Sequence, residues 1–134
     1  MMKFNIEKEV SRDVLENIFV TALEGGSNYW YYINPKNHKK VRDAVSREDE
    51  PFFSMAFAKA ILDHDVSIEV HDIEDMEDDT PIGVINYNTI KDGLQKMIDS
   101  GDGWALFNEI SEQGDAESSD VCFQYMVLGE VIYG

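Results

Sequence analysis

The sequence predicts a helix-rich α+β fold in a single domain, residues 1–134, with a small antiparallel sheet packed by helices. Two patterns support this fold class. Several segments repeat apolar residues at helical spacing, and two short runs, residues 66–70 and 82–86, alternate as strands do. The length of 134 residues and a hydrophobic content of 43% are enough to build one sizeable core.

The first helix is predicted from Ser11 to Glu24. Ser11 is a good N-cap, and the apolar residues behind it recur on one helix face. They are Val14, Leu15, Ile18, Phe19, Ala22 and Leu23. Gly25 and Gly26 stand where a left-handed residue often ends a helix, so we expect the helix to stop at about Glu24. Alternation over residues 3–7 predicts a short strand before this helix.

The segment after the glycines, residues 28–33, is dense in aromatic residues. It is interpreted as a short strand that joins the sheet or as a helical turn packed on the first helix. Residues 36–47 hold five of the eleven Lys and Arg residues and predict a surface loop. A second helix is expected from about Glu48 to Asp63, with Pro51 in its first turn.

Residues 66–87 predict an antiparallel hairpin, because two alternating runs flank a short polar connection. That connection, residues 72–79, carries six acids in eight residues. Their mutual repulsion favours an exposed loop.

Three more helices are predicted after the hairpin. The first has Thr89 as its N-cap and ends at Gly101, and the second opens at Gly103. Their inward residues are expected to be Ile90, Leu94, Met97, Ile98, Leu106, Phe107 and Ile110. The last helix begins at Asp115 or Ser119 and is apolar on nearly every face, which is typical of a helix buried on most sides.

The charge is high and unevenly distributed. The net charge is −16; residues 1–47 carry eight Lys/Arg against six Asp/Glu, and residues 48–134 carry three against twenty-one. An acidic surface repels phosphates, so we expect no direct nucleic-acid binding and a protein partner with a basic surface. Solubility alone is the other explanation of the charge.

Localisation is predicted to be cytoplasmic. Cys122 is the single cysteine, so an internal disulfide is impossible. The first residues carry charges where a signal peptide has its apolar core, and no apolar run approaches the ~18 residues that span a bilayer. We therefore expect no membrane contact. A homo-oligomer is a further alternative, because the aromatic residues 29–32 could lie on the surface and mediate self-association.

Standard catalytic motifs are missing from the sequence, which has no GxGxxG, GxxxxGK[ST], GxSxG, HExxH or CxxC. We predict no cofactor and no metal centre. Four residues are weak metal candidates, because they bring imidazoles and carboxylates close together in the sequence. They are His64, Asp65, His71 and Asp72. A structural or surface role is the favoured interpretation of these residues.

Two segments, residues 22–33 and 120–134, place polar side chains among apolar neighbours. If they pack together, they form a polar, aromatic-walled pocket. Its candidate residues are Glu24, Asn28, Trp30, Asp120, Gln124, Glu130 and Tyr133. In a catalytic site Glu24 or Glu130 would be the general base, and Trp30 would stack on the ligand. The simpler interpretation is a structural seam whose polar groups satisfy one another or face solvent.

The same two segments resemble a protein family. ALEGGSNYW and the terminal SSDVCFQYMVLGEVIYG are similar to an ALEGG-x-x-Y-W motif and a D-x-x-x-Q-x-x-x-x-GE-x-x-YG ending. These motifs belong to small uncharacterised proteins of bacteriophages, prophages and related mobile elements. The resemblance implies a mobile-element origin and no particular activity. It directs attention to Glu24, Gly25, Gly26, Asn28, Tyr29, Trp30, Asp120, Gln124, Gly129, Glu130, Tyr133 and Gly134.

The sequence therefore predicts a non-enzymatic accessory protein of a phage or mobile element that binds another protein through its acidic surface. A mimic of nucleic acid is the most specific form, because dispersed carboxylates can imitate a phosphate array. The alternative is a small-ligand-binding or catalytic domain that uses the polar pocket.

Overall fold

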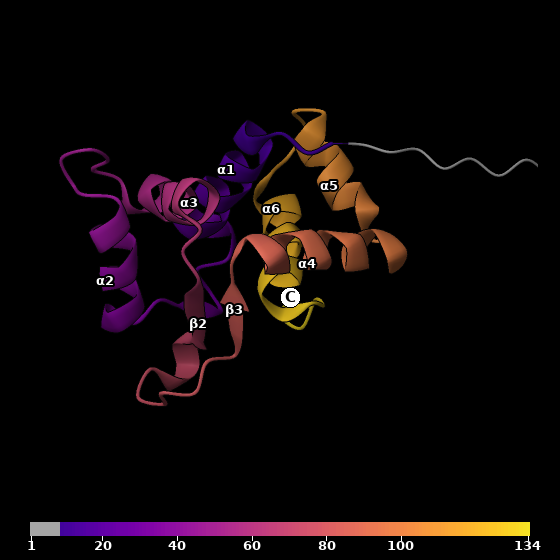
Figure 1. Ribbon diagram of the computed structural model, residues 1–134. Coiled ribbons are helices and arrows are strands. Elements are labelled where there is room, and N and C mark those ends of the chain that lie inside the picture. Colours follow the sequence, from indigo (N-terminus) through magenta and orange to yellow (C-terminus); the bar gives the residue numbers. More distant parts are fainter. Residues whose placement is uncertain (1–8) are drawn as a thin grey trace, which may run out of the picture.

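The computed structural model describes residues 9–134 and confirms the helix-rich α+β fold (Figure 1). This part of the chain contains six α-helices and a three-stranded antiparallel sheet of order β1-β2-β3. The strand predicted for residues 3–7 lies outside the described residues.

The first helix, α1 (Arg12–Thr21), begins as predicted, since the Ser11 side chain accepts a hydrogen bond from the Val14 amide. Its end differs from the prediction. Instead of stopping at Glu24, the α-helix ends at Thr21 and widens into the π-helical turn η1 (Ala22–Gly26). The Ser27 amide donates to the Ala22 carbonyl at 2.9 Å, five residues back, which is the π-helical pattern.

The sheet contains the predicted hairpin and a third strand. β1 (Tyr31–Tyr32) pairs antiparallel with β2 (Ile68–Asp72), so the strand interpretation of the aromatic segment is the one that the structure adopts. β2 also pairs with β3 (Gly83–Ile85), with Ile68 opposite Ile85. The connection between β2 and β3 contains the 3-10 turn η2 (Ile73–Asp75), and its acids are exposed, as predicted.

The surface loop predicted for residues 36–47 is wrong, because most of this segment is the helix α2 (Pro35–Ala44). Asn34 caps it by accepting from the Asn37 amide at 3.0 Å, and Pro35 occupies the first turn. Val41 packs into the core. The apolar pattern of the sequence did not indicate this helix, because its many basic residues leave only a very narrow apolar stripe.

The next helix, α3 (Phe53–His64), begins later than the predicted Glu48. A turn precedes it, in which the Glu50 amide donates to the Ser46 carbonyl at 2.9 Å. The Arg42 guanidinium of α2 holds this turn by donating to the Glu50 and Pro51 carbonyls at 2.6 and 3.1 Å. Pro51 therefore stands before the helix and not in its first turn.

The last three helices are α4 (Tyr87–Asp99), α5 (Gly103–Ile110) and α6 (Ala116–Leu128). The cap of α4 is Asn86, and the predicted cap Thr89 is its partner in a capping box. Asp115 caps α6, which was one of the two predicted starts. Ile98 and Phe107 do not face inward as predicted, because they are 51% and 56% exposed.

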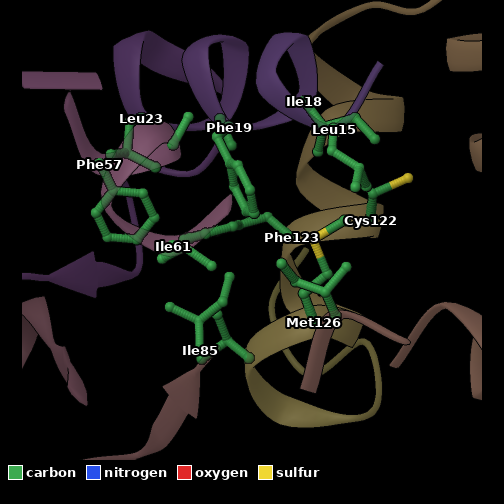
Figure 2. Close-up of a cluster of buried hydrophobic side chains, with 14 of the residues drawn as sticks. Leu15, Ile18, Phe19, Leu23, Phe57, Ile61, Ile85, Cys122, Phe123 and Met126 are labelled. Carbon is green, nitrogen blue, oxygen red and sulfur yellow. The ribbon is translucent and has the colours of Figure 1, made fainter. Parts of the chain in front are cut away.

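Helix α6 forms the centre of the core, as its all-round apolar sequence predicts. Its side chains meet residues of α1, α3 and β3 (Figure 2). The labelled members of this cluster are Leu15, Ile18, Phe19, Leu23, Phe57, Ile61, Ile85, Cys122, Phe123 and Met126. Burial raises the pKa of the Cys122 thiol, so this cysteine is an inert core residue.

Helix α4 crosses α6 at very close range (Figure 1). Gly93 faces α6, and a Cβ atom there would lie 2.2 Å from the Tyr125 carbonyl oxygen. Gly83 of β3 approaches the other end of α6, where a Cβ atom would lie 2.4 Å from the Val127 carbonyl oxygen. In residues 9–134, no helix combines the length and the apolar character needed to cross a bilayer.

Candidate functional site

The candidate site is centred on Asp120, a buried carboxylate on α6. Its Oδ1 accepts from Ser27 Oγ and from Trp30 Nε1, both at 2.7 Å. Its Oδ2 accepts from the Tyr29 hydroxyl at 2.5 Å and from Gln124 Nε2 at 3.1 Å. Four neutral donors therefore occupy both oxygens, and no cation pairs with Asp120 within the described part of the chain. We call these five residues the Asp120 network.

The turn η1 positions three of the donors. Because η1 ends at Gly26, residues 27–30 follow it directly and face the first turns of α6. Gly26 permits this contact, since a Cβ atom there would lie 2.9 Å from the Ala116 carbonyl oxygen. One glycine of the predicted helix stop thus serves the close approach of two segments.

Gln124 lies one helical turn beyond Asp120 and binds the C-terminal segment. Its Oε1 accepts from the Ile132 and Tyr133 amides at 2.9 and 3.0 Å, and its Nε2 donates to the Tyr133 carbonyl at 3.0 Å. The Tyr133 ring stacks on Trp30, with centroids 5.3 Å apart and an angle of 7° between the rings. The segments 22–33 and 120–134 therefore pack together through both polar and aromatic contacts.

A hollow of about 620 Å³ lies beside the network. We call it the Asp120 hollow. Its lining comes from η1, α6 and the C-terminal residues, and consists of Gly25, Gly26, Tyr29, Ala116, Glu117, Asp120, Val121, Gln124, Val131, Tyr133 and Gly134. Tyr29 and Asp120 both line the hollow, and Tyr29 is 50% exposed while Asp120 is buried.

The predicted site residues divide into two groups. Trp30, Asp120, Gln124 and Tyr133 come together in the seam just described. The two candidate bases do not join them: Glu24 accepts a hydrogen bond from Ser54 Oγ of α3 at 3.0 Å, and Glu130 is exposed beyond the end of α6. Asn28 is exposed as well, and it does not line the hollow.

Ser27 was missing from the predicted site, and Tyr29 entered it only through the family resemblance. Both are donors to Asp120. The sequence could have pointed to them, because a buried carboxylate without a basic neighbour needs hydroxyl, amide or indole donors. All four residues of 27–30 carry such a donor, and three of them, Ser27, Tyr29 and Trp30, bind Asp120.

The four weak metal candidates do not share a common set of contacts. His64 and Asp65 are exposed at the end of α3, and Asp65 is its left-handed C-cap. His71 is buried, and its Nε2 contacts the Asp79 carbonyl at 3.1 Å, while Asp72 accepts from the Glu74 amide. Among residues 9–134, no group of three or more His, Cys, Asp or Glu side chains could hold a metal ion.

The chemistry of the network is that of a saturated hydrogen-bond acceptor. A carboxylate whose lone pairs are all engaged cannot take a proton from a ligand unless a donor leaves first. Tyr29 is the donor that can leave, since it is the most exposed of the four donors. The geometry thus favours the structural interpretation of this seam.

Tyr29 of the network and its neighbour Tyr31 make the free energy of unfolding fall at alkaline pH. Burial, and then the hydrogen bond to Asp120, raises the pKa of Tyr29 to about 12, and burial raises that of Tyr31 to about 12. The pKa of an unfolded tyrosine is about 10. The stabilisation that comes from keeping these two hydroxyls protonated is therefore complete below about pH 10, and it is lost as the pH rises toward 12. We expect Tyr29→Phe to make the alkaline loss less steep, measured by urea unfolding at several pH values. An unchanged pH profile would contradict this assignment.

The comparisons with known proteins do not indicate a function. The chain matches no protein-family model, no curated protein and no solved structure. The kinship with proteins of mobile elements therefore stays a prediction that rests on the two terminal motifs.

Proposed function

We propose that this protein is a non-enzymatic accessory protein of a phage or mobile element, and that it binds another protein through its acidic surface. The distribution of ion pairs carries the proposal. Within residues 9–134 there are four ion pairs, and their acids are Glu16, Asp43, Glu50 and Asp63. None of the later acids has a basic partner in that part of the chain, so their charge is left for a partner.

Five of the nine Lys and Arg residues in the described residues 9–134 are bound within the protein. Arg12, Lys39 and Lys59 are in ion pairs. Lys40 donates to the Ser67 carbonyl at 3.0 Å, and Arg42 donates to two carbonyls near α3. These contacts hold positive charge on the α2–α3 side, so the rest of the surface keeps its negative field.

The exposed acids are spread over several elements of the second half of the chain. They include Glu74, Asp75, Glu77, Asp78, Asp79, Asp92, Asp99, Glu112, Asp115 and Glu117. A dispersed array of this kind supports the more specific proposal of a nucleic-acid mimic, which occupies a basic DNA-binding cleft. If the negative charge served solubility alone, the protein would need no basic partner.

A salt titration tests the proposal. The full-length protein is titrated against purified bacterial DNA-binding proteins that carry labelled DNA, and DNA release is followed by anisotropy. We expect release at low salt and a loss of affinity of about tenfold or more on going to physiological salt. The variant Glu74→Gln/Glu77→Gln, changed in the exposed β2–β3 connection, should bind more weakly. Salt-insensitive association, or none with any protein of the set, would refute the proposal.

A second candidate function, small-ligand binding, is supported by the Asp120 hollow of about 620 Å³. A ligand there would displace the Tyr29 hydroxyl and disturb Trp30. A screen of nucleotides and metabolites by tryptophan fluorescence, with Tyr29→Phe as control, tests it. A folded protein that responds to none of them would count against this function.

A further inference from the structure

A larger hollow, of about 750 Å³, lies between α4, α5 and the residues that lead into α1. We call it the α4–α5 groove. Its walls are mainly apolar side chains of the two helices: Tyr87, Ile90, Leu94, Ile98, Leu106, Phe107 and Ile110. On α4 the lining positions follow the spacing of a single helix face. This groove is separate from the Asp120 hollow, with which it shares no lining residue.

The rim of the groove exposes large apolar side chains. Tyr87, Ile98 and Phe107 are 55%, 51% and 56% exposed. Ile90, Leu94 and Leu106 form the buried floor between them. Exposed apolar residues that gather on two neighbouring helices around a hollow are typical of an interaction surface, whereas single ones are not.

Charge decides which occupant fits. Glu9 lines the groove, and Asp92 and Asp99 are exposed on the adjoining face of α4. Among residues 9–134, Lys91 is the one base in the lining, and the chain has no Lys or Arg after Lys96. A second copy would bring together two chains of net charge −16, and a membrane surface would present anionic lipids. A partner with basic residues is the complementary occupant.

We propose that the α4–α5 groove binds an amphipathic helix of a partner protein. Apolar residues of the partner helix lie between α4 and α5, and its Lys or Arg residues face Glu9, Asp92 and Asp99. The sign of the partner's charge rests on the proposed function; the place of contact rests on the groove alone.

The test uses a matched pair of substitutions in the full-length chain. Ile98→Asp puts a charge into the groove, and Ile132→Asp adds the same charge at an isoleucine of similar exposure, 51% against 58%, outside it. Both side chains are mostly in solvent, so both variants should fold, which circular dichroism checks. The probe is a labelled helical peptide of about 14 residues, made of Leu and Lys, with all Leu on one face.

We expect Ile98→Asp to weaken binding of this peptide by about tenfold or more, because the charge would be buried against Leu side chains. Ile132→Asp should change binding by less than about twofold. A peptide of the same composition in an order without an apolar face should bind the wild-type protein about tenfold more weakly.

Equal effects of the two substitutions, equal binding of the two peptides, or no binding would overturn the inference. A dimer in solution that Ile98→Asp dissociates would also overturn it, since the occupant would then be a second copy. Salt-dependent peptide binding that ignores both substitutions refutes the groove and leaves the acidic-surface proposal standing. Groove-dependent peptide binding without DNA release refutes that proposal and leaves the groove.

Discussion

Replacing Asp120 with alanine is expected to lower the free energy of unfolding by about 3–5 kcal/mol. The substitution removes the common acceptor of Ser27, Tyr29, Trp30 and Gln124. The Ser27 hydroxyl, the indole N–H and the Gln124 amide are buried, so they would lose a partner where water cannot easily replace it. Urea unfolding followed by circular dichroism measures the change.

Three variants separate the causes of this loss. Asp120→Asn keeps the shape but offers one acceptor oxygen, so we expect an intermediate loss of about 1–3 kcal/mol. Tyr29→Phe removes one half-exposed donor and should cost about 1 kcal/mol. Glu117→Ala changes an exposed acid on the same helix and should stay within about 0.5 kcal/mol of the wild type. An Asp120→Ala protein as stable as Glu117→Ala would show that the network does not hold the seam together.

Replacing Gly93 with alanine is expected to destabilise the protein by about 3 kcal/mol or more. The new methyl group would lie 2.2 Å from the Tyr125 carbonyl oxygen and 2.7 Å from its carbon. These are backbone atoms of the central helix, so α4 and α6 would have to move apart and lose contact along their crossing. Thermal and urea unfolding measure the loss.

Gly103→Ala is the matched control, since it makes the same change in the neighbouring helix. A methyl group there would meet only Ile98, at 3.8 Å, which is ordinary contact. Alanine also favours a helix over glycine, so we expect Gly103→Ala to be neutral or more stable by up to about 1 kcal/mol. If Gly93→Ala behaved in the same way, the close crossing of α4 and α6 would be refuted.

The sequence predicted those parts of the fold that depend on apolar patterning. The central place of α6 followed from its apolar residues on every face, and the β2–β3 hairpin followed from strict alternation. Helix α2 was missed because its core contact is narrow and its sequence is mostly basic. Asn34 and Pro35 are a local start signal that the prediction overlooked, whereas the contacts of Arg42 with the segment before α3 cannot be read from local sequence.

For the candidate site, the meeting of the two terminal segments was predictable, while its membership was not. Asp120 and Gln124 lie four residues apart on one helix face, so their partnership could be read from spacing. Glu24 was expected in the seam because it is a polar side chain among apolar neighbours at the predicted end of the first helix. The π-helical turn η1 changes the direction of the chain, and Glu24 bonds Ser54 of α3 instead.

The wide separation of its bonded residues gives the Asp120 network a consequence for synthesis. Ser27, Tyr29 and Trp30 reach an acceptor that lies 90–93 positions later in the chain. At a translation rate of about 5–20 residues per second, they leave the ribosome roughly 5–20 s before Asp120 does. During that interval the Trp30 ring and the apolar face of α1 have no central helix to cover them. These apolar surfaces of the nascent chain therefore stay exposed until α6 has been synthesised.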